Sequence, residues 1–213
     1  MVRLDELFTL RDATSDDFGW ILDLAEELAE VTMAPLRGVW GERARAFART
    51  SITKLIPHCR AGSYRFLVAS DKATLARVGY LILNLYQECP FETRETYIED
   101  MGVVSEYLGR RAGHYLTDQA ARISAEAGVH YLGAHISFAN QRALLAALGN
   151  GFELESYRIV RPCTPEAILT TEASGAALER QEQSEKLRRT LLSRRLKRRQ
   201  RKAPPPPPTP SPE

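Results

Sequence analysis

Cysteine is scarce in this 213-residue sequence, and it has no long apolar run. The three cysteines, Cys59, Cys89 and Cys163, form an odd set without metal-ligand spacing, which disfavours a disulfide framework and indicates a reducing compartment. No apolar run reaches the ~18 residues needed to span a bilayer, and the acidic, broken N-terminal stretch is not typical of a signal peptide. We therefore expect a soluble, cytoplasmic protein without a membrane partner.

Acidic residues are missing from one stretch near the C-terminus. Lys186 to Lys202 contains ten Lys or Arg residues and no acid, whereas residues 1–185 contain 19 basic and 26 acidic side chains. The net charge of +2 therefore combines an acidic body with a basic tail. We expect this segment to be a basic helix that binds RNA, ribosomes or an acidic protein partner, and its weak leucine stripe allows a homodimer. A solvated extension is the alternative.

Composition divides the chain into three parts. Residues 1–165 are expected to form one catalytic domain, because the chain is long enough for one sizeable core with extensions. Residues 166–202 are predicted to be a linker and the basic helical extension. Residues 203–213 include Pro204 to Pro208 and are predicted to be disordered, since such a segment forms neither helix nor packed core.

Patterns of apolar residues and capping signals predict an α/β domain with a mixed sheet. Val78 to Tyr86 is expected to pair with Ser63 to Ala69 as an antiparallel hairpin. The predicted elements are, in order, a strand at Phe8 to Leu10, a helix after Ser15, a helix over Gly41 to His58, strands at Ser63 to Ala69, Val78 to Tyr86 and Thr96 to Val104, a helix that includes Tyr115, a strand at Tyr131 to Ser137, a helix after Asn140 and a strand at Tyr157 to Val160.

A basic turn bracketed by Gly109 and Gly113 follows the strand predicted at Thr96 to Val104. Glycine permits a tight turn, which leaves several main-chain N–H groups pointing one way at the start of the next helix. A helix N-terminus attracts anions, and Arg110 and Arg111 add full positive charges. The turn is therefore a candidate site for a pyrophosphate or a 3′-phosphate. An ordinary strand-to-helix turn is the alternative.

A second pattern lies downstream, in the stretch 138–153, which contains Asn140 and Ala143 three residues apart and then the pair Gly151 and Phe152. With the turn, this pattern resembles the GNAT superfamily of acyl-CoA-dependent N-acyltransferases, over about Leu10 to Val160. In that family a loop Gln/Arg-x-x-Gly-x-Gly/Ala holds the cofactor, and a later helix contains Asn-x-x-Ala and Gly-Phe. The resemblance implies a mixed, mostly antiparallel sheet flanked by helices, with acetyl-CoA or another acyl-CoA as cosubstrate.

The sequence departs from the family pattern at three positions. Leu108 stands where the family has Gln or Arg, and Arg111 stands where it has the first Gly. Ala147 stands seven residues after the Asn, where many members carry a Tyr that protonates the leaving thiolate. The resemblance still implies a set of cofactor contacts, most of them through the main chain: Val103, Val104, Gly109, Arg110, Arg111, Ala112, Gly113, His114 and Asn140.

Carboxylates on the strand before the turn are candidates for the general base. By two-residue alternation, Glu95 and Glu99 share one face of the strand with Tyr97, whereas Asp100 is expected on the other face. Glu95 is the first candidate, because ribosomal-protein acetyltransferases of this superfamily carry a catalytic Glu at a similar place. Glu99 is a close competitor, and a solvated carboxylate is the alternative reading of Glu95. His135 is a candidate donor to the thiolate, although a lone His in a strand is more often structural.

The resemblance and the residues together favour an N-acetyltransferase, which would transfer an acetyl or acyl group from acetyl-CoA to a primary amine by direct attack. The acceptor is a small molecule, a protein lysine or a protein N-terminus. The alternative is a catalytically weak or inactive module of the same fold that binds an acyl-CoA and serves regulation. Leu108, Arg111 and Ala147 favour this alternative.

Overall fold

The computed structural model describes residues 3–32, 39, 41–88, 94–137 and 140–155. The chain divides into two units, Met1–Val160 and Arg161–Glu213, and all the described residues belong to the first. The strand expected at Tyr157 to Val160, the basic segment Lys186 to Lys202 and the domain boundaries at 165 and 202 lie outside the described residues.

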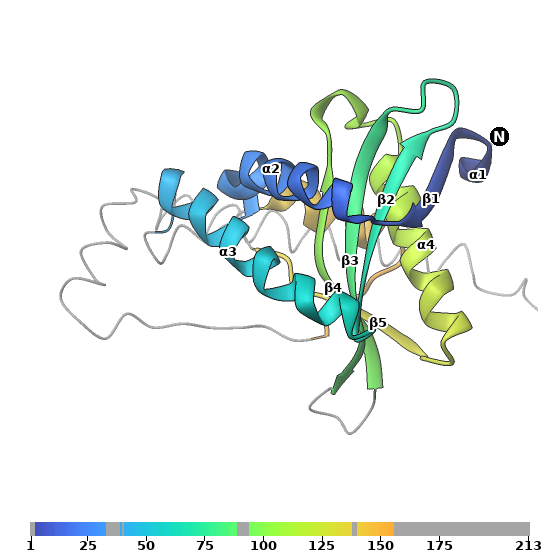
Figure 1. The fold of residues 1–213 in the computed structure, drawn as a ribbon. Helices are drawn as coiled ribbons and strands as arrows, with labels where there is room; N and C mark the ends of the chain where they lie inside the picture. The colour runs from blue at the N-terminus through green and yellow to red at the C-terminus, as the bar shows by residue number, and fades with distance from the viewer. Residues whose placement is uncertain (1–2, 33–38, 40, 89–93, 138–139, 156–213) are drawn as a thin grey trace, which may run out of the picture. The chain divides into compact units, whose positions relative to one another are not determined.

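The described elements follow the predicted order (Figure 1). A short helix before the first strand was not predicted, and the strand expected at Tyr131 to Ser137 ends at Ala134. The elements are α1 (Leu4–Leu7), β1 (Phe8–Asp12), α2 (Ser15–Thr32), α3 (Gly41–Arg60), β2 (Tyr64–Asp71), β3 (Arg77–Glu88), β4 (Arg94–Val103), the 3-10 turn η2 (Ser105–Tyr107), α4 (Ala112–Glu126), β5 (Tyr131–Ala134) and α5 (Gln141–Gly149).

The five strands form one sheet in the order β1-β2-β3-β4-β5. The first three pairings are antiparallel, and the last, between β4 and β5, is parallel. The hairpin of β2 and β3 sets Leu67 opposite Leu81. A parallel neighbour requires a crossover, and α4 supplies it between β4 and β5. The predicted mixed, mostly antiparallel sheet is confirmed.

Helices cover both faces of the sheet, with α2 and α3 on one side and α4 on the other (Figure 1). Alternation along β2 explains this arrangement, because successive side chains point to opposite faces. Phe66 and Val68 pack with α2 residues such as Ile21, whereas Leu67 packs with α4 residues such as Leu116. We call these sides the α2/α3 face and the α4 face.

A buried carboxylate fixes the start of α2. Asp17 is fully buried and accepts bonds from Arg11 at 2.6 and 2.9 Å, while Arg77 lies 3.0 Å away. It also accepts from the main-chain N–H and the hydroxyl of Thr14, as in a capping box. The guanidinium of Arg11 and these donors hold the pKa of Asp17 well below its usual range. The network joins β1, α2 and β3.

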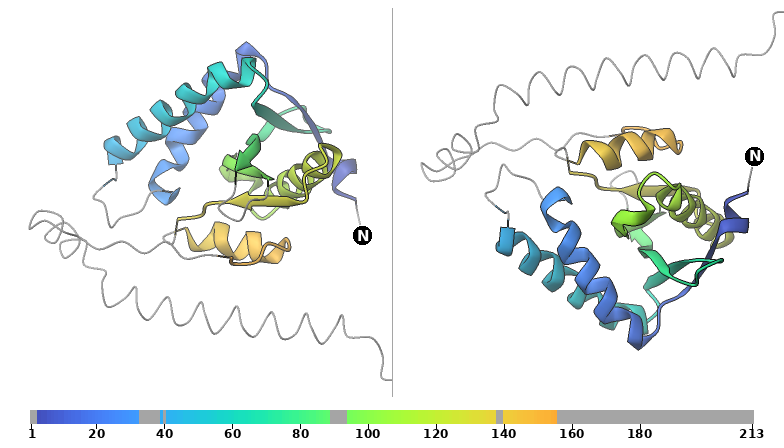
Figure 2. Two further views of the ribbon diagram at one scale, coloured as in Figure 1. Left: turned by 90° about the horizontal axis from the view of Figure 1, so that it is seen from below. Right: turned by 90° about the horizontal axis from the view of Figure 1, so that it is seen from above.

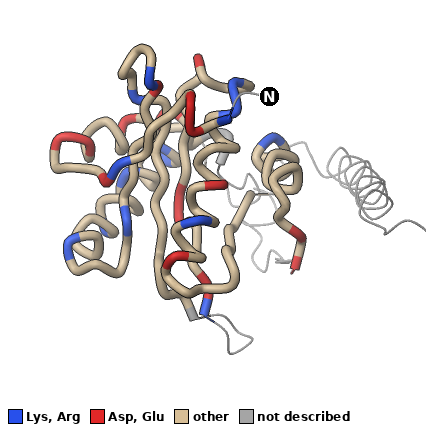
Figure 3. Tube along the Cα trace, turned by 90° about the vertical axis from the view of Figure 1, so that its right-hand side faces the viewer, with Lys and Arg blue, Asp and Glu red and all other residues tan. Residues whose placement is uncertain are grey.

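The last described helix, α5, lies beside β5 and near α4 (Figure 2). Acidic and basic residues alternate along α4 (Figure 3), where Arg122 and Glu126 form an exposed ion pair at 3.6 Å. Within the described part of the chain, no helix is both long and apolar enough to span a bilayer.

Candidate active site

The strands β4 and β5 separate before β4 ends. Their pairing runs from Glu95 opposite Tyr131 to Ile98 opposite Ala134, yet β4 continues to Val103. Beyond Ile98, no described strand pairs with the β5 side of β4. Unpaired strand edges bind extended ligands through main-chain hydrogen bonds. We call this stretch, residues 99–103, the open edge of β4.

An extra residue in β4 marks the point where the open edge begins. Leu83 of β3 lies opposite Ile98, and Ile82 lies opposite Asp100, so Glu99 has no partner in the ladder. Such a bulge reverses the alternation that follows it. Asp100 therefore shares the α2/α3 face with Ile82, and the prediction that placed it on the opposite face from Glu95 was wrong, because alternation assumes a regular strand.

Two consecutive acids thus stand at the bulge. Burial raises the pKa of Glu99. Burial, and then the charge of Glu99, raise the pKa of Tyr64 and of Tyr97. Burial also raises the pKa of Asp100, although the Met101 N–H donates to it at 2.8 Å and the Tyr80 hydroxyl donates as well. Carboxyl groups with raised pKa values are suited to accept a proton near neutral pH.

Glu95 lies against the paired part of β5. A Cβ built on Gly133 would be only 2.7 Å from Oε2 of Glu95 and 3.0 Å from Cδ2 of Tyr97, so both side chains cover this glycine. Burial, and then the charge of Glu155, raise the pKa of Glu95. Burial raises the pKa of Tyr97 to about 12, with smaller effects of Glu99 and Glu95. The α2/α3 face of β4 therefore carries several acids beside protonated tyrosines.

The basic turn keeps a glycine-like backbone although its sequence departs from the family pattern. Arg111 adopts the left-handed conformation (φ 67°) as N-cap of α4, and Gly109 has φ 82°. This conformation costs a residue other than glycine roughly 1 kcal/mol or more, so glycine is preferred at such positions. The Arg111 side chain is exposed, so it does not fill the turn from inside the protein.

The first turn of α4 contains main-chain N–H groups that are available as donors. No side chain caps it among the described residues, and its first turn contains no acid. The first hydrogen bond that reaches back into the turn runs from Tyr115 N–H to the Arg111 carbonyl oxygen, which leaves the N–H groups of Ala112, Gly113 and His114. The guanidinium of Arg110 lies 5.4 Å from the centre of the Tyr107 ring, close to these donors in sequence.

Gly113 faces the end of the open edge. A Cβ built on it would meet only Cγ2 of Val103, at 3.9 Å, which is an ordinary contact. The protein itself therefore does not require glycine at this position. The side chain of Val103 is buried in the core, and Val104 donates its N–H to Val78 at 3.0 Å. Val103 thus packs the end of β4 against α4, and Val104 ties the chain after β4 to β3.

The remaining predicted residues have different surroundings. Asn140 is the N-cap of α5 and accepts from the Ala143 N–H at 3.1 Å, which agrees with its alternative reading as a cap. His135 is exposed and follows the last residue of β5. Ala147 is buried, and its carbonyl oxygen accepts from the main chain of Asn150 and Phe152. The structure thus supplies no hydroxyl at position 147.

Sequence reasoning gave no role to Asp100 or Tyr97 and did not consider Tyr64 or Tyr80. Their grouping depends on the bulge and on neighbours from β2 and β3. No local pattern in the sequence signals the extra residue at Glu99. The pairing of Ile82 with Asp100 is visible only once the strands are in register.

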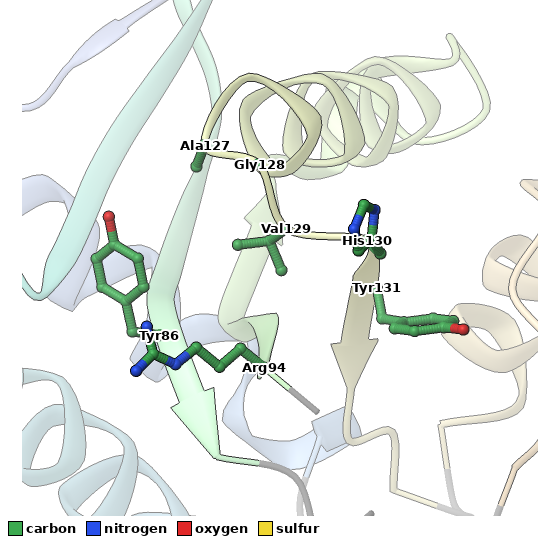
Figure 4. Close-up of a pocket in the computed structure, with 7 residues that line it drawn as sticks. All are labelled: Tyr86, Arg94, Ala127, Gly128, Val129, His130 and Tyr131. Atoms are coloured by element: carbon green, nitrogen blue, oxygen red, sulfur yellow. The ribbon is translucent and has the colours of Figure 1, made fainter. Parts of the chain in front are cut away.

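A pocket of about 330 Å³ lies elsewhere (Figure 4). It is formed where β4 and β5 begin, at the end of β4 remote from the bulge. None of the predicted catalytic or cofactor residues lines it. Its lining residues are Tyr86, Arg94, Ala127, Gly128, Val129, His130 and Tyr131.

Comparison with known proteins agrees with this geometry. Residues 25–152 match the model of the acetyltransferase (GNAT) family. No curated protein sequence matches the chain significantly. The fold and the diverging strands define an acetyltransferase-type domain, and the chain belongs to the GNAT acetyltransferase family.

Solved structures show the same fold. The chain is similar to a Trypanosoma brucei acetyltransferase, with 18% identity and a TM-score of 0.52 over 72% of this chain and 98% of that one. It is also similar to the aminoglycoside 6′-N-acetyltransferase AAC(6′)-Ih from Acinetobacter baumannii (15%, TM-score 0.51, 72% and 95%). A third similar structure is AAC(6′)-Iy in complex with the bisubstrate analogue CoA-S-monomethyl-acetylneamine (13%, TM-score 0.53, 74% and 97%).

Proposed function

We propose that the protein is an N-acetyltransferase that uses acetyl-CoA, or a related acyl-CoA, to modify a primary amine by direct transfer. One observation carries this proposal. The open edge of β4 adjoins two features, the uncapped first turn of α4 and the α2/α3 face of β4, which carries acids of raised pKa. The turn and the open edge can bind an acyl-CoA, and the acidic face can receive an amine.

The acyl-CoA half rests on main-chain donors. The N–H groups of Ala112, Gly113 and His114 would receive the pyrophosphate, with Arg110 and Arg111 adding charge. The pantetheine arm would then pair with the open edge of β4, as an added strand does. The thioester carbonyl would lie near the bulge, where a main-chain N–H can stabilise the oxyanion that develops during attack.

The amine half rests on the α2/α3 face of β4. An amine arrives mostly as its ammonium form, so a base must remove one proton before the nitrogen attacks the thioester carbon. Glu99 stands at the bulge and Glu95 lies against Gly133, and either can take that proton. Collapse of the tetrahedral intermediate breaks the C–S bond, and the thiolate then takes a proton. We assign this last proton to His135, which follows β5, or to solvent.

The chemistry of the face favours a cationic acceptor. Glu95, Glu99 and Asp100 would attract an ammonium group while their raised pKa values ease its deprotonation. Two of the similar structures are aminoglycoside 6′-N-acetyltransferases, which supports an amine. A small molecule, a lysine side chain and a protein N-terminus all fit this requirement. We place the activity in the cytoplasm, in line with the sparse cysteines.

Release of CoA from acetyl-CoA, measured across a panel of polyamines, aminosugars, lysine peptides and N-terminal peptides, tests the proposal. We expect turnover with at least one member of the panel. Turnover that persists in the double variant Glu95→Gln/Glu99→Gln would contradict the assigned base.

A second candidate is a regulatory module that binds an acyl-CoA without turning it over. The buried Ala147 favours it, because the family tyrosine that protonates the thiolate is absent. Binding of acetyl-CoA with no CoA release across the panel would support this candidate over the enzyme.

A further inference from the structure

Four residues where α4 meets α5 form a chain of polar contacts away from the acidic face. Asn150 donates through Nδ2 to Oγ1 of Thr117 at 2.7 Å, and its Oδ1 contacts Nδ1 of His114. Thr117 donates to the carbonyl oxygen of His114 at 2.9 Å. On the other side of the ring, Nε2 of His114 lies 3.3 Å from Oδ2 of Asp118. The chain links the first turn of α4 to the residue that ends α5.

The contacts indicate which of these polar groups donate and which accept hydrogen bonds. The single hydroxyl proton of Thr117 is used on a main-chain carbonyl, so its oxygen accepts from Asn150. Oδ1 of Asn150 is then an acceptor, which requires a proton on Nδ1 of His114. Nε2 of the same ring lies against the carboxylate of Asp118. The contact with Asn150 therefore fits the His114 tautomer that carries a proton on Nδ1.

These contacts tie α5 to the body of the domain. Ala147 is the buried residue of α5, and Phe152 beyond its end packs against the core of the α4 face. Asn150 adds two side-chain bonds at the same end. Asn140, the N-cap, is ten residues earlier, which is about 15 Å away along a helix. Holding one end of this short rigid helix therefore sets the position of the other.

We propose that His114 is a positioning residue that couples the anion-binding turn of α4 to the placement of α5. Its main-chain N–H belongs to the open first turn, while its ring holds Asn150. An anion bound at the turn would restrict the backbone of His114. Because the ring contacts Asn150, the position of α5 and of its N-cap Asn140 would then be restricted as well. The coupling rests on the proposed binding of acyl-CoA, whereas the attachment of α5 does not.

Two measurements on the same variants test this proposal. In the ligand-free protein we expect His114→Ala and Asn150→Ala each to raise amide hydrogen exchange in α5 about tenfold, with no change in α2. By calorimetry we expect each to weaken acetyl-CoA binding about tenfold, with the double variant no weaker than either single one. Thr117→Val has nearly the same shape and serves as a second variant if Asn150→Ala folds poorly. Glu126→Gln, in the exposed pair with Arg122, is the control and should change neither quantity.

Unchanged α5 exchange in Asn150→Ala and Thr117→Val would overturn the attachment. Additive effects of the two single variants on acetyl-CoA affinity would overturn the coupling. A purely structural role predicts faster exchange with unchanged affinity, which would also overturn it. If the unaltered protein binds no acetyl-CoA, the proposed function fails together with the coupling, and the exchange data still decide the attachment.

Discussion

The carboxylate of Glu95 occupies the space that a side chain at Gly133 would need. A Cβ at Gly133 would be 2.7 Å from Oε2 of Glu95 and 3.0 Å from the carboxyl carbon. Glycine at position 133 of β5 thus allows Glu95 of β4 to lie over the part of β5 that pairs with β4. This acid is half-buried there, and burial raises its pKa.

Gly133→Ala should therefore displace Glu95 without changing the first turn of α4. We expect kcat for amine acetylation to fall, with acetyl-CoA affinity within about twofold of the unaltered protein, because the three atoms nearest to the new methyl group are side-chain atoms of Glu95 and Tyr97. Steady-state kinetics and calorimetry measure the two effects. Gly19→Ala in α2 is the matched control, since a Cβ there meets nothing within 4 Å. Equal loss of acetyl-CoA binding in Gly133→Ala would contradict this separation of the two halves.

The raised pKa of Glu99 predicts the acid limb of the pH profile. A base acts in its deprotonated form, so kcat/KM should fall as pH drops through a pKa that lies above the ordinary value of about 4.3. Replacing the catalytic Glu by Gln should lower kcat/KM by roughly 10²- to 10⁴-fold and remove this limb. Comparison of Glu99→Gln with Glu95→Gln identifies the base. Retention of the limb in the double variant would exclude both residues.

Asp17 predicts a specific loss of stability. Removing one partner of a buried ion pair costs about 3 to 5 kcal/mol, so we expect Asp17→Asn to lower the free energy of unfolding by about that much at pH 7. Because the pKa of Asp17 is depressed in the folded state, its contribution is present at neutral pH and is lost as pH falls below the unfolded value of about 3.9. Urea unfolding at pH 7 and at pH 3 measures both effects.

The exposed pair of Asp12 and Arg65, at 2.8 Å, offers a matched control. Asp12→Asn should change the free energy of unfolding by less than about 1 kcal/mol, because solvent screens surface pairs. If Asp17→Asn were no more harmful than Asp12→Asn, the network would not hold β1, α2 and β3 together as described.

The basic tail gives a separate prediction that depends on sequence alone. We propose that Lys186 to Lys202 attaches the acidic body to RNA or another polyanion, so truncation after Gly175 should abolish retention on a polyanion column. Retention of the full chain should fall steeply as salt rises. The truncated chain should keep its response to acetyl-CoA. Equal retention of both proteins, or binding that does not depend on salt, would contradict a role for the tail in attachment.

The order of the elements was predictable, because β-branched runs, caps and helical apolar faces are local signals. Ser63 to Ala69 and Val78 to Tyr86 pair as expected, and the strand before the basic turn ends at Val103, one residue before its expected end. Gly109 and Gly113 also indicated the turn that precedes α4, and its role as a cofactor site stays a prediction. These features depend on residues that are close together in the sequence.

The arrangement of the acids was not predictable, because it depends on register between strands. One extra residue at Glu99 reverses the faces that alternation assigns, and so moves Asp100 beside Tyr80. The bonds of His114 to Asn150 likewise join residues 36 positions apart. The left-handed backbone of Arg111 shows that a turn can keep the geometry of glycine when the residue has changed.

Thermal stabilisation by acetyl-CoA tests most directly whether the turn of α4 and the open edge of β4 form an acyl-CoA site. A ligand at about 100 times its dissociation constant adds about 2.7 kcal/mol to the stability of the native state. We predict a clear rise in melting temperature with millimolar acetyl-CoA, and its loss in Gly113→Leu, where the larger side chain obstructs the turn while the fold has room for a Cβ. No rise with the unaltered protein, or an equal rise with Gly113→Leu, would contradict the site described here.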